Sequence, residues 1–110
     1  MGNAIKSRIL LVEDEPAVRI GTEQFLRQRS FTVVTAASGE EALEKFAKVD
    51  VIILDIMLPV MSGIETLRKI RQTSDVPVLM LTALHDEPTQ VASFDELADD
   101  YMSKPFSLVI

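Results

Sequence analysis

The chain has 110 residues, of which 47% are hydrophobic, and shows no internal repeat, Gly/Ser-rich linker or low-complexity stretch, so it is expected to form one globular domain spanning residues 1–110. A formal net charge of −6 argues against direct binding of this domain to nucleic acid or to an anionic membrane surface. The apolar runs are too short to span a bilayer and the amino terminus lacks the long apolar stretch of a secretory signal, which predicts a cytoplasmic domain. The absence of cysteine excludes disulfides but agrees with almost any compartment.

The first third of the chain reads as strand, helix and strand. Residues 8–13 predict a first strand, because they contain the run Ile9-Leu10-Leu11-Val12, which is typical of a buried parallel strand, and residues 31–35 predict a second strand. Pro16 is well placed as the first residue of the intervening helix, because the first amide of a helix has no partner within the helix. The expected inward face of that helix consists of Val18, Thr22, Phe25, Leu26 and Arg29.

Two capping boxes predict where the next helices begin. Ser38 precedes Glu41 and Ser62 precedes Glu65 by the spacing at which the two side chains satisfy the unpaired amides of a helix start. The expected inward residues are Ala42, Leu43, Phe46 and Ala47 in the second helix and Ile64, Leu67 and Ile70 in the third.

The remaining elements continue the alternation. Residues 49–54 and 76–82 predict two more buried strands, residues 88–97 predict a fourth helix, and residues 100–103 predict a short last strand. Strands that alternate with helices assemble into a parallel sheet with helices on both faces. The expected fold class is therefore α/β, with a doubly wound, five-stranded parallel sheet.

Acidic residues follow two of the predicted buried strands. Glu13 and Asp14 end the first strand region, and Asp55 directly follows the run Val51-Ile52-Ile53-Leu54. Ligands bind open α/β sheets at the carboxyl ends of the strands, above all where the strand order reverses. If these two strands are neighbours, the three carboxylates meet, and two such charges about 4 Å apart repel by roughly 4 kcal/mol at an effective dielectric near 20. Such a cluster holds protons or a cation, and an all-oxygen site without His or Cys suits Mg²⁺.

Five separated motifs occur in a characteristic order along the chain. They are Leu11-Val12-Glu13-Asp14-Glu15-Pro16, then Asp55 with Leu58-Pro59 and Gly63, then Thr82-Ala83, then Asp99-Asp100-Tyr101, and last Lys104-Pro105-Phe106. With these motifs the chain closely resembles, over nearly its whole length, the CheY-like receiver domain of bacterial two-component response regulators. The resemblance implies a flavodoxin-like sheet with strand order 2-1-3-4-5, which makes strands one and three neighbours.

The resemblance also implies a signalling function. Asp55 would accept a phosphoryl group from a sensor histidine kinase, and the domain would control an output domain or a partner. Mg²⁺ would be bound directly by Asp14, Asp55 and the backbone carbonyl of Met57, and through water by Glu13. Such a domain is not an enzyme in the usual sense, although it assists its own phosphotransfer and dephosphorylation.

Three further residues complete the implied site. Lys104 would place a positive charge on the phosphoryl oxygens, and the hydroxyl of Thr82 would donate a hydrogen bond to them. Thr82 and Tyr101 would report the switch, because their surroundings differ with and without the phosphoryl group. Taken singly, a Thr that closes a strand and a Lys before a proline are usually structural or solvated residues, so only the combination with the acidic cluster favours a functional interpretation.

The chain departs from the receiver pattern at its C-terminus. A receiver normally continues past Lys104-Pro105-Phe106 into a fifth helix, whereas this sequence stops at Ile110, so Ser107-Leu108-Val109-Ile110 resembles only a first turn. We therefore expect that the last helix is missing or truncated and that an output domain is lost by the truncation. An apolar face left uncovered would favour pairing of two copies as a homodimer.

One alternative function stays open at this point. A receiver-like protein-interaction module that is never phosphorylated would show the same motifs, and a small phosphodonor would distinguish the two. A flavin-binding electron carrier shares the expected topology, but Glu13-Asp14-Glu15 at the first strand-helix turn would repel the phosphate of its cofactor. A nucleotide triphosphatase would need a phosphate-binding loop, which the sequence lacks.

Overall fold

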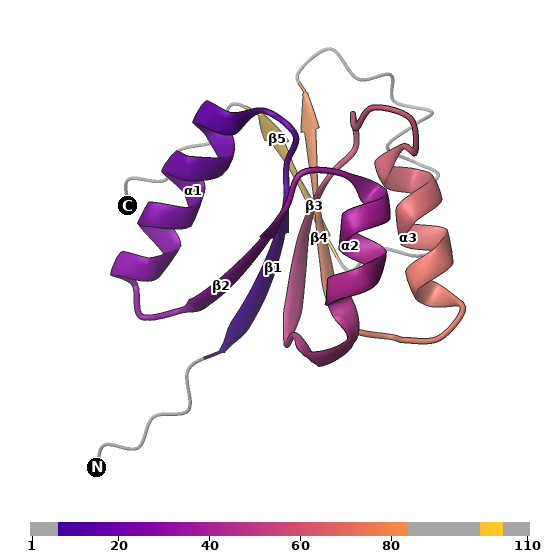
Figure 1. The fold of residues 1–110 in the computed structure, drawn as a ribbon, viewed down its shortest axis with the longest axis horizontal. Helices are drawn as coiled ribbons and strands as arrows, with labels where there is room; N and C mark the ends of the chain where they lie inside the picture. Colours follow the sequence, from indigo (N-terminus) through magenta and orange to yellow (C-terminus); the bar gives the residue numbers. More distant parts are fainter. Residues whose placement is uncertain (1–6, 84–99, 105–110) are drawn as a thin grey trace.

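The computed structural model describes residues 7–83 and 100–104, and it places residues 82, 83 and 100–104 through their strand pairing (Figure 1). The predicted fourth helix at residues 88–97 and the helical turn at residues 107–110 lie outside this description.

Five parallel strands form a single sheet in the order β2-β1-β3-β4-β5, which confirms the flavodoxin-like order expected from the sequence. The strands are β1 (Arg8–Val12), β2 (Thr32–Ala36), β3 (Val51–Asp55), β4 (Val78–Ala83) and β5 (Asp100–Lys104). In the ladder between β1 and β3, Val12 pairs with Leu54. The residues that follow these two strands therefore emerge side by side at one edge of the sheet.

The main hydrophobic core lies between the sheet and two helices, α2 (Gly39–Lys45) and α3 (Gly63–Arg71), which cover one face (Figure 1). Full burial of a large aliphatic side chain contributes about 1.5–3 kcal/mol, so this layer supplies much of the stability of the domain. Its fully buried members include Leu10, Val12, Ile52, Leu54, Leu67, Ile70, Val78 and Met80. Leu67 and Ile70 confirm the inward stripe expected for the third helix.

The opposite face of the sheet is covered by α1 (Pro16–Gln28), which packs against β2 and β1 (Figure 1). Thr22 is the one residue of α1 that is fully buried, and Phe25 and Leu26 are half-buried. The prediction that Arg29 lies on the inward face is wrong. Arg29 is exposed and follows the last residue of the helix, and its guanidinium stacks 4.9 Å from the centre of the Phe25 ring.

Ser38 and Ser62 cap the helices α2 and α3 as predicted. The amide of Glu41 donates to Ser38 Oγ and that of Glu65 to Ser62 Oγ, each over 3.1 Å. Glu41 also accepts the amide of Ala37, one residue before the cap, and the ammonium of Lys45. The hydrogen bond from Ala37, followed by that from Lys45, lowers the pKa of the Glu41 carboxyl below its ordinary value.

The second helix is shorter than its apolar pattern predicted. α2 ends at Lys45, and Phe46–Lys48 form a single 3-10 turn. Phe46 packs against the main core as expected, but Ala47 is exposed. The prediction for Ala47 is wrong because the tighter winding of a 3-10 turn moves successive side chains to new directions.

Candidate metal and phosphoacceptor site

The first acidic loop connects β1 to α1. The amide of Glu13 donates to the carbonyl of Ala36 over 3.0 Å, which extends the pairing of β1 with β2 by one step. The Glu13 carboxylate accepts the amide of Glu15 and is almost completely buried, with 1% of the residue exposed. Asp14, the next residue, is exposed. The two acids therefore differ in setting, because one is enclosed at the sheet edge and the other faces solvent.

Asp55 is the last residue of β3 and is 3% exposed. Its Oδ1 accepts the backbone amide of Met57 over 3.1 Å, a bond that fixes the plane of the carboxylate. The amide of Ile56, the next residue, donates to the carbonyl of Leu81 in the neighbouring strand β4. The backbone directly after Asp55 is therefore held against the sheet. Asp55 is thus a buried carboxylate at a defined position rather than a mobile surface acid.

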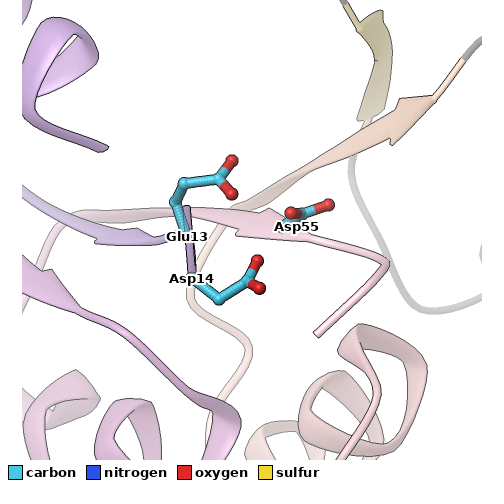
Figure 2. Close-up of side chains that lie close together, drawn as sticks. All are labelled: Glu13, Asp14 and Asp55. Carbon is cyan, nitrogen blue, oxygen red and sulfur yellow. The ribbon is translucent and has the colours of Figure 1, made fainter. Parts of the chain in front are cut away.

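The three carboxylates converge at the edge where β1 and β3 end (Figure 2). One oxygen from each of Glu13, Asp14 and Asp55 lies within 4.8 Å of the others. The proximity expected from the sequence is therefore confirmed. Two buried acids and one exposed acid offer three hard oxygen ligands. Such ligands suit Mg²⁺, which is usually bound through one or two carboxylates and keeps several waters.

The ends of β4 and β5 reach the same edge of the sheet. In the β3–β4 ladder Asp55 pairs with Leu81, so Thr82 follows one residue beyond the level of Asp55. In the β4–β5 ladder Thr82 pairs with Ser103 and Ala83 with Lys104. The backbone thus brings Thr82 and Lys104 to the site edge, while Tyr101, opposite Met80, lies further back along β5. The roles of these three side chains remain predictions.

The loop after Asp55 folds back tightly on the end of β3. The amide of Gly63 donates to the carbonyl of Ile56 over 2.8 Å, and a Cβ atom at Gly63 would collide with the carbonyl oxygen of Asp55 and lie 2.7 Å from Ile56 Cα. Only glycine permits this approach. The start of α3 is therefore packed directly against the backbone of the candidate phosphoacceptor.

Val60, in the same loop, has the left-handed value φ 66° and is 95% exposed. A β-branched residue in this conformation is strained by about 1–2 kcal/mol, whereas glycine adopts it without strain. Glycine offsets part of this gain, because its greater freedom in the unfolded chain lowers the free energy of unfolding by about 0.5–1 kcal/mol. We expect Val60→Gly to raise the free energy of unfolding by about 0.5–1 kcal/mol in denaturant titrations. Val60→Ala is the control, because it removes the exposed apolar group but keeps a Cβ. A glycine variant no more stable than the alanine variant would contradict the strain.

Two hydrogen-bond donors at the site were not predicted from the sequence. One is the amide of Met57, which was expected to contribute its carbonyl. The other is Arg19, whose Nη1 donates to the carbonyl of Glu13. A signal for Arg19 was available, because it stands in the first turn of α1, where the helix dipole disfavours a positive charge.

The sheet order and the acidic edge define a flavodoxin-like receiver, and known proteins agree with that class. The family model for the response regulator receiver domain matches residues 9–109. This chain therefore belongs to the response regulator receiver domain family of two-component systems.

Relatives and solved structures support the assignment. The chain is 45% identical over 104 residues to response regulator RR06 of Streptococcus pneumoniae, covering 93% of this chain and 48% of the relative. It is also 45% identical over 105 residues to regulatory protein VanRB of Enterococcus faecalis, covering 94% and 48%. The chain thus spans about half the length of these curated relatives.

Two structures show the same fold. Chemotaxis protein CheY4 of Vibrio cholerae superimposes with a TM-score of 0.86 at 33% identity, covering 94% of this chain and 91% of that one. Response regulator TrrA of Thermotoga maritima, solved in complex with Mg²⁺ and BeF, superimposes with a TM-score of 0.82 at 37% identity, covering 94% of this chain and 90% of that one.

The part of this chain described at residues 7–83 and 100–104 contains no helix long and apolar enough to cross a membrane.

Proposed function

We propose that this domain is a phosphorylation-dependent switch in which Asp55 accepts a phosphoryl group from a sensor histidine kinase. The observation that carries the proposal is the convergence of Glu13, Asp14 and Asp55, with one oxygen of each within 4.8 Å of the others, at the sheet edge of a receiver-family chain. Asp14, Asp55 and the Met57 carbonyl would hold Mg²⁺ directly, and Glu13 would hold it through water.

The chemistry assigned to Asp55 is a simple exchange of bonds. A carboxylate oxygen of Asp55 forms a bond to phosphorus as the phosphorus–nitrogen bond of the kinase phosphohistidine breaks, and the electron pair leaves with the imidazole. The hydrogen bond from the Met57 amide to Asp55 Oδ1 orients the carboxylate, so little reorganisation is needed at the moment of transfer. Bound Mg²⁺ supplies positive charge that offsets the charge on the transferring oxygens.

The remaining site residues would read the new charge. Lys104 would donate to the phosphoryl oxygens from the end of β5, and Thr82 would do so from the end of β4, which the strand register supports. Tyr101 would change its surroundings when Thr82 moves. Couplings of this kind amount to about 1–3 kcal/mol, which changes the ratio of two conformational states by a factor of about 10 to 100.

The relatives support a proposal about the setting of the domain. One of them, 48% identical over 105 residues, is the transcriptional regulatory protein TrcR of Mycobacterium tuberculosis, and this chain covers 40% of it. We propose that this receiver works in the cytoplasm and controls an output domain, and that two copies pair through an apolar face. Its partner would be a sensor histidine kinase.

Radiolabelled acetyl phosphate with Mg²⁺ tests the central step. We expect label on the wild-type protein, none on Asp55→Asn, and none on wild type when EDTA removes the metal. Asp50→Asn is the matched control, because Asp50 precedes the same strand at the opposite edge of the sheet, where it accepts the amide of Arg8. Label that persists on Asp55→Asn would move the nucleophile elsewhere. A wild-type protein that takes no label from any small phosphodonor would favour the unphosphorylated interaction module.

A further inference from the structure

Arg19 reaches from the first turn of α1 to the backbone of the acidic loop. Its Nη1 lies 2.9 Å from the carbonyl oxygen of Glu13 and 3.4 Å from that of Asp14. These two carbonyls belong to the two peptide units that flank the α-carbon of Asp14. One guanidinium nitrogen therefore contacts the backbone on both sides of this residue.

The contact matters because Asp14 differs from the other two acids. The carboxylates of Glu13 and Asp55 each accept a backbone amide, from Glu15 and Met57 respectively. Within residues 7–83, no hydrogen bond joins the Asp14 carboxylate to another group, and the residue is exposed. The direction of the Asp14 side chain is therefore set by its backbone. Two side chains hold that backbone: the Glu13 carboxylate accepts the amide of the 14–15 peptide unit, and Arg19 donates to the carbonyls on both sides of Asp14.

We propose that Arg19 is a positioning residue for the metal site, which keeps the Asp14 carboxylate directed toward those of Glu13 and Asp55. This inference rests on the proposed function, because it concerns the same Mg²⁺ site. Arg19 itself would not be a ligand of the ion. It acts through the carbonyls of the loop, as groups behind the direct ligands of a metal commonly do.

The proposal makes an unusual prediction about sign. An arginine is always charged, so its presence near a cation site opposes cation binding by simple electrostatics. Removal of that charge alone would tighten Mg²⁺ binding. Removal of the backbone contact would instead let Asp14 swing away and weaken binding. The two roles of Arg19, as a nearby charge and as a positioning group, therefore predict opposite changes in affinity.

The matched control is Arg27, on the same helix. Its Nη2 donates to the carbonyl of Val33 over 2.7 Å, and its Nε pairs with Glu23 over 2.9 Å. Arg27 thus also ties α1 to backbone outside the helix, but on the β2 side, away from the acidic loop. A change at Arg27 removes the same charge and the same kind of contact without touching the candidate site.

Mg²⁺ titration by calorimetry compares wild type, Arg19→Gln and Arg27→Gln, with folding checked by circular dichroism. We expect the dissociation constant to rise about 10-fold in Arg19→Gln, within the range usual for loss of a group behind a metal ligand, and to stay within about twofold in Arg27→Gln. Arg19→Met, which keeps the aliphatic stem, carries the same expectation if the glutamine variant folds poorly. Unchanged or tighter binding in the Arg19 variants would overturn the proposal, whereas a wild type that binds no Mg²⁺ would instead refute the proposed metal site.

Discussion

Replacement of Gly63 by alanine is expected to lower the free energy of unfolding by about 3 kcal/mol, at the upper end of the usual cost of overpacking. The added Cβ would meet the backbone of Asp55 and Ile56, with 2.7 Å to Ile56 Cα and 2.9 Å to the carbonyl carbon of Asp55. These atoms belong to the end of β3 and cannot rotate away as a flexible side chain would. The start of α3 must therefore move, and Asp55 is expected to move with it, so Mg²⁺ affinity should fall as well.

Gly21 provides the control for this prediction. It lies within α1, is exposed, and would gain a Cβ with no atom within 4 Å. The same change to alanine should raise the free energy of unfolding there by about 0.5–1 kcal/mol, because glycine is a poor residue for a helix interior. Denaturant unfolding of both variants measures the contrast. A Gly63→Ala protein as stable as wild type would show that the loop after Asp55 adjusts without cost.

Asp14→Asn is expected to weaken Mg²⁺ binding about 100-fold, which corresponds to about 2.7 kcal/mol. The substitution keeps the size of the side chain but removes one full charge from a cluster of three acids. The metal-free variant should be no less stable than wild type, because a repulsion within the cluster is removed with the charge. Calorimetric titration gives the affinity, and thermal unfolding with and without Mg²⁺ shows whether the ion still stabilises the folded state.

Asp50→Asn again serves as the comparison, since it removes an equal charge from the opposite edge of the sheet. Its Mg²⁺ affinity should match that of wild type even if the lost contact with the Arg8 amide lowers stability. An Asp14→Asn protein that binds Mg²⁺ as tightly as wild type would remove Asp14 from the proposed ligand set. Asp55 and Glu13 would then have to hold the ion with backbone and water oxygens.

Much of the fold of this domain follows directly from its local sequence. Continuous apolar runs and the Ser38 and Ser62 caps predicted the strands and the starts of α2 and α3, and the structure confirms them. The meeting of Glu13, Asp14 and Asp55 was predicted on the condition that the first and third strands are neighbours, and the structure confirms both the condition and the meeting. Such features depend on residues close in sequence and on the general rule that parallel strands present their carboxyl ends at one edge. The receiver motifs then supplied the strand order and the family.

Features that depend on distances between separate elements were not predictable in this way. The contact of Arg19 with the acidic loop and the close approach of Gly63 to Asp55 arise only when α1 and α3 are docked against the sheet. The exposed position of Ala47 and the stacking of Arg29 on Phe25 were decided by the exact residue at which each helix ends. A periodic pattern shows which face of a helix is apolar, but only packing determines where the helix stops and which backbone atoms its side chains can reach.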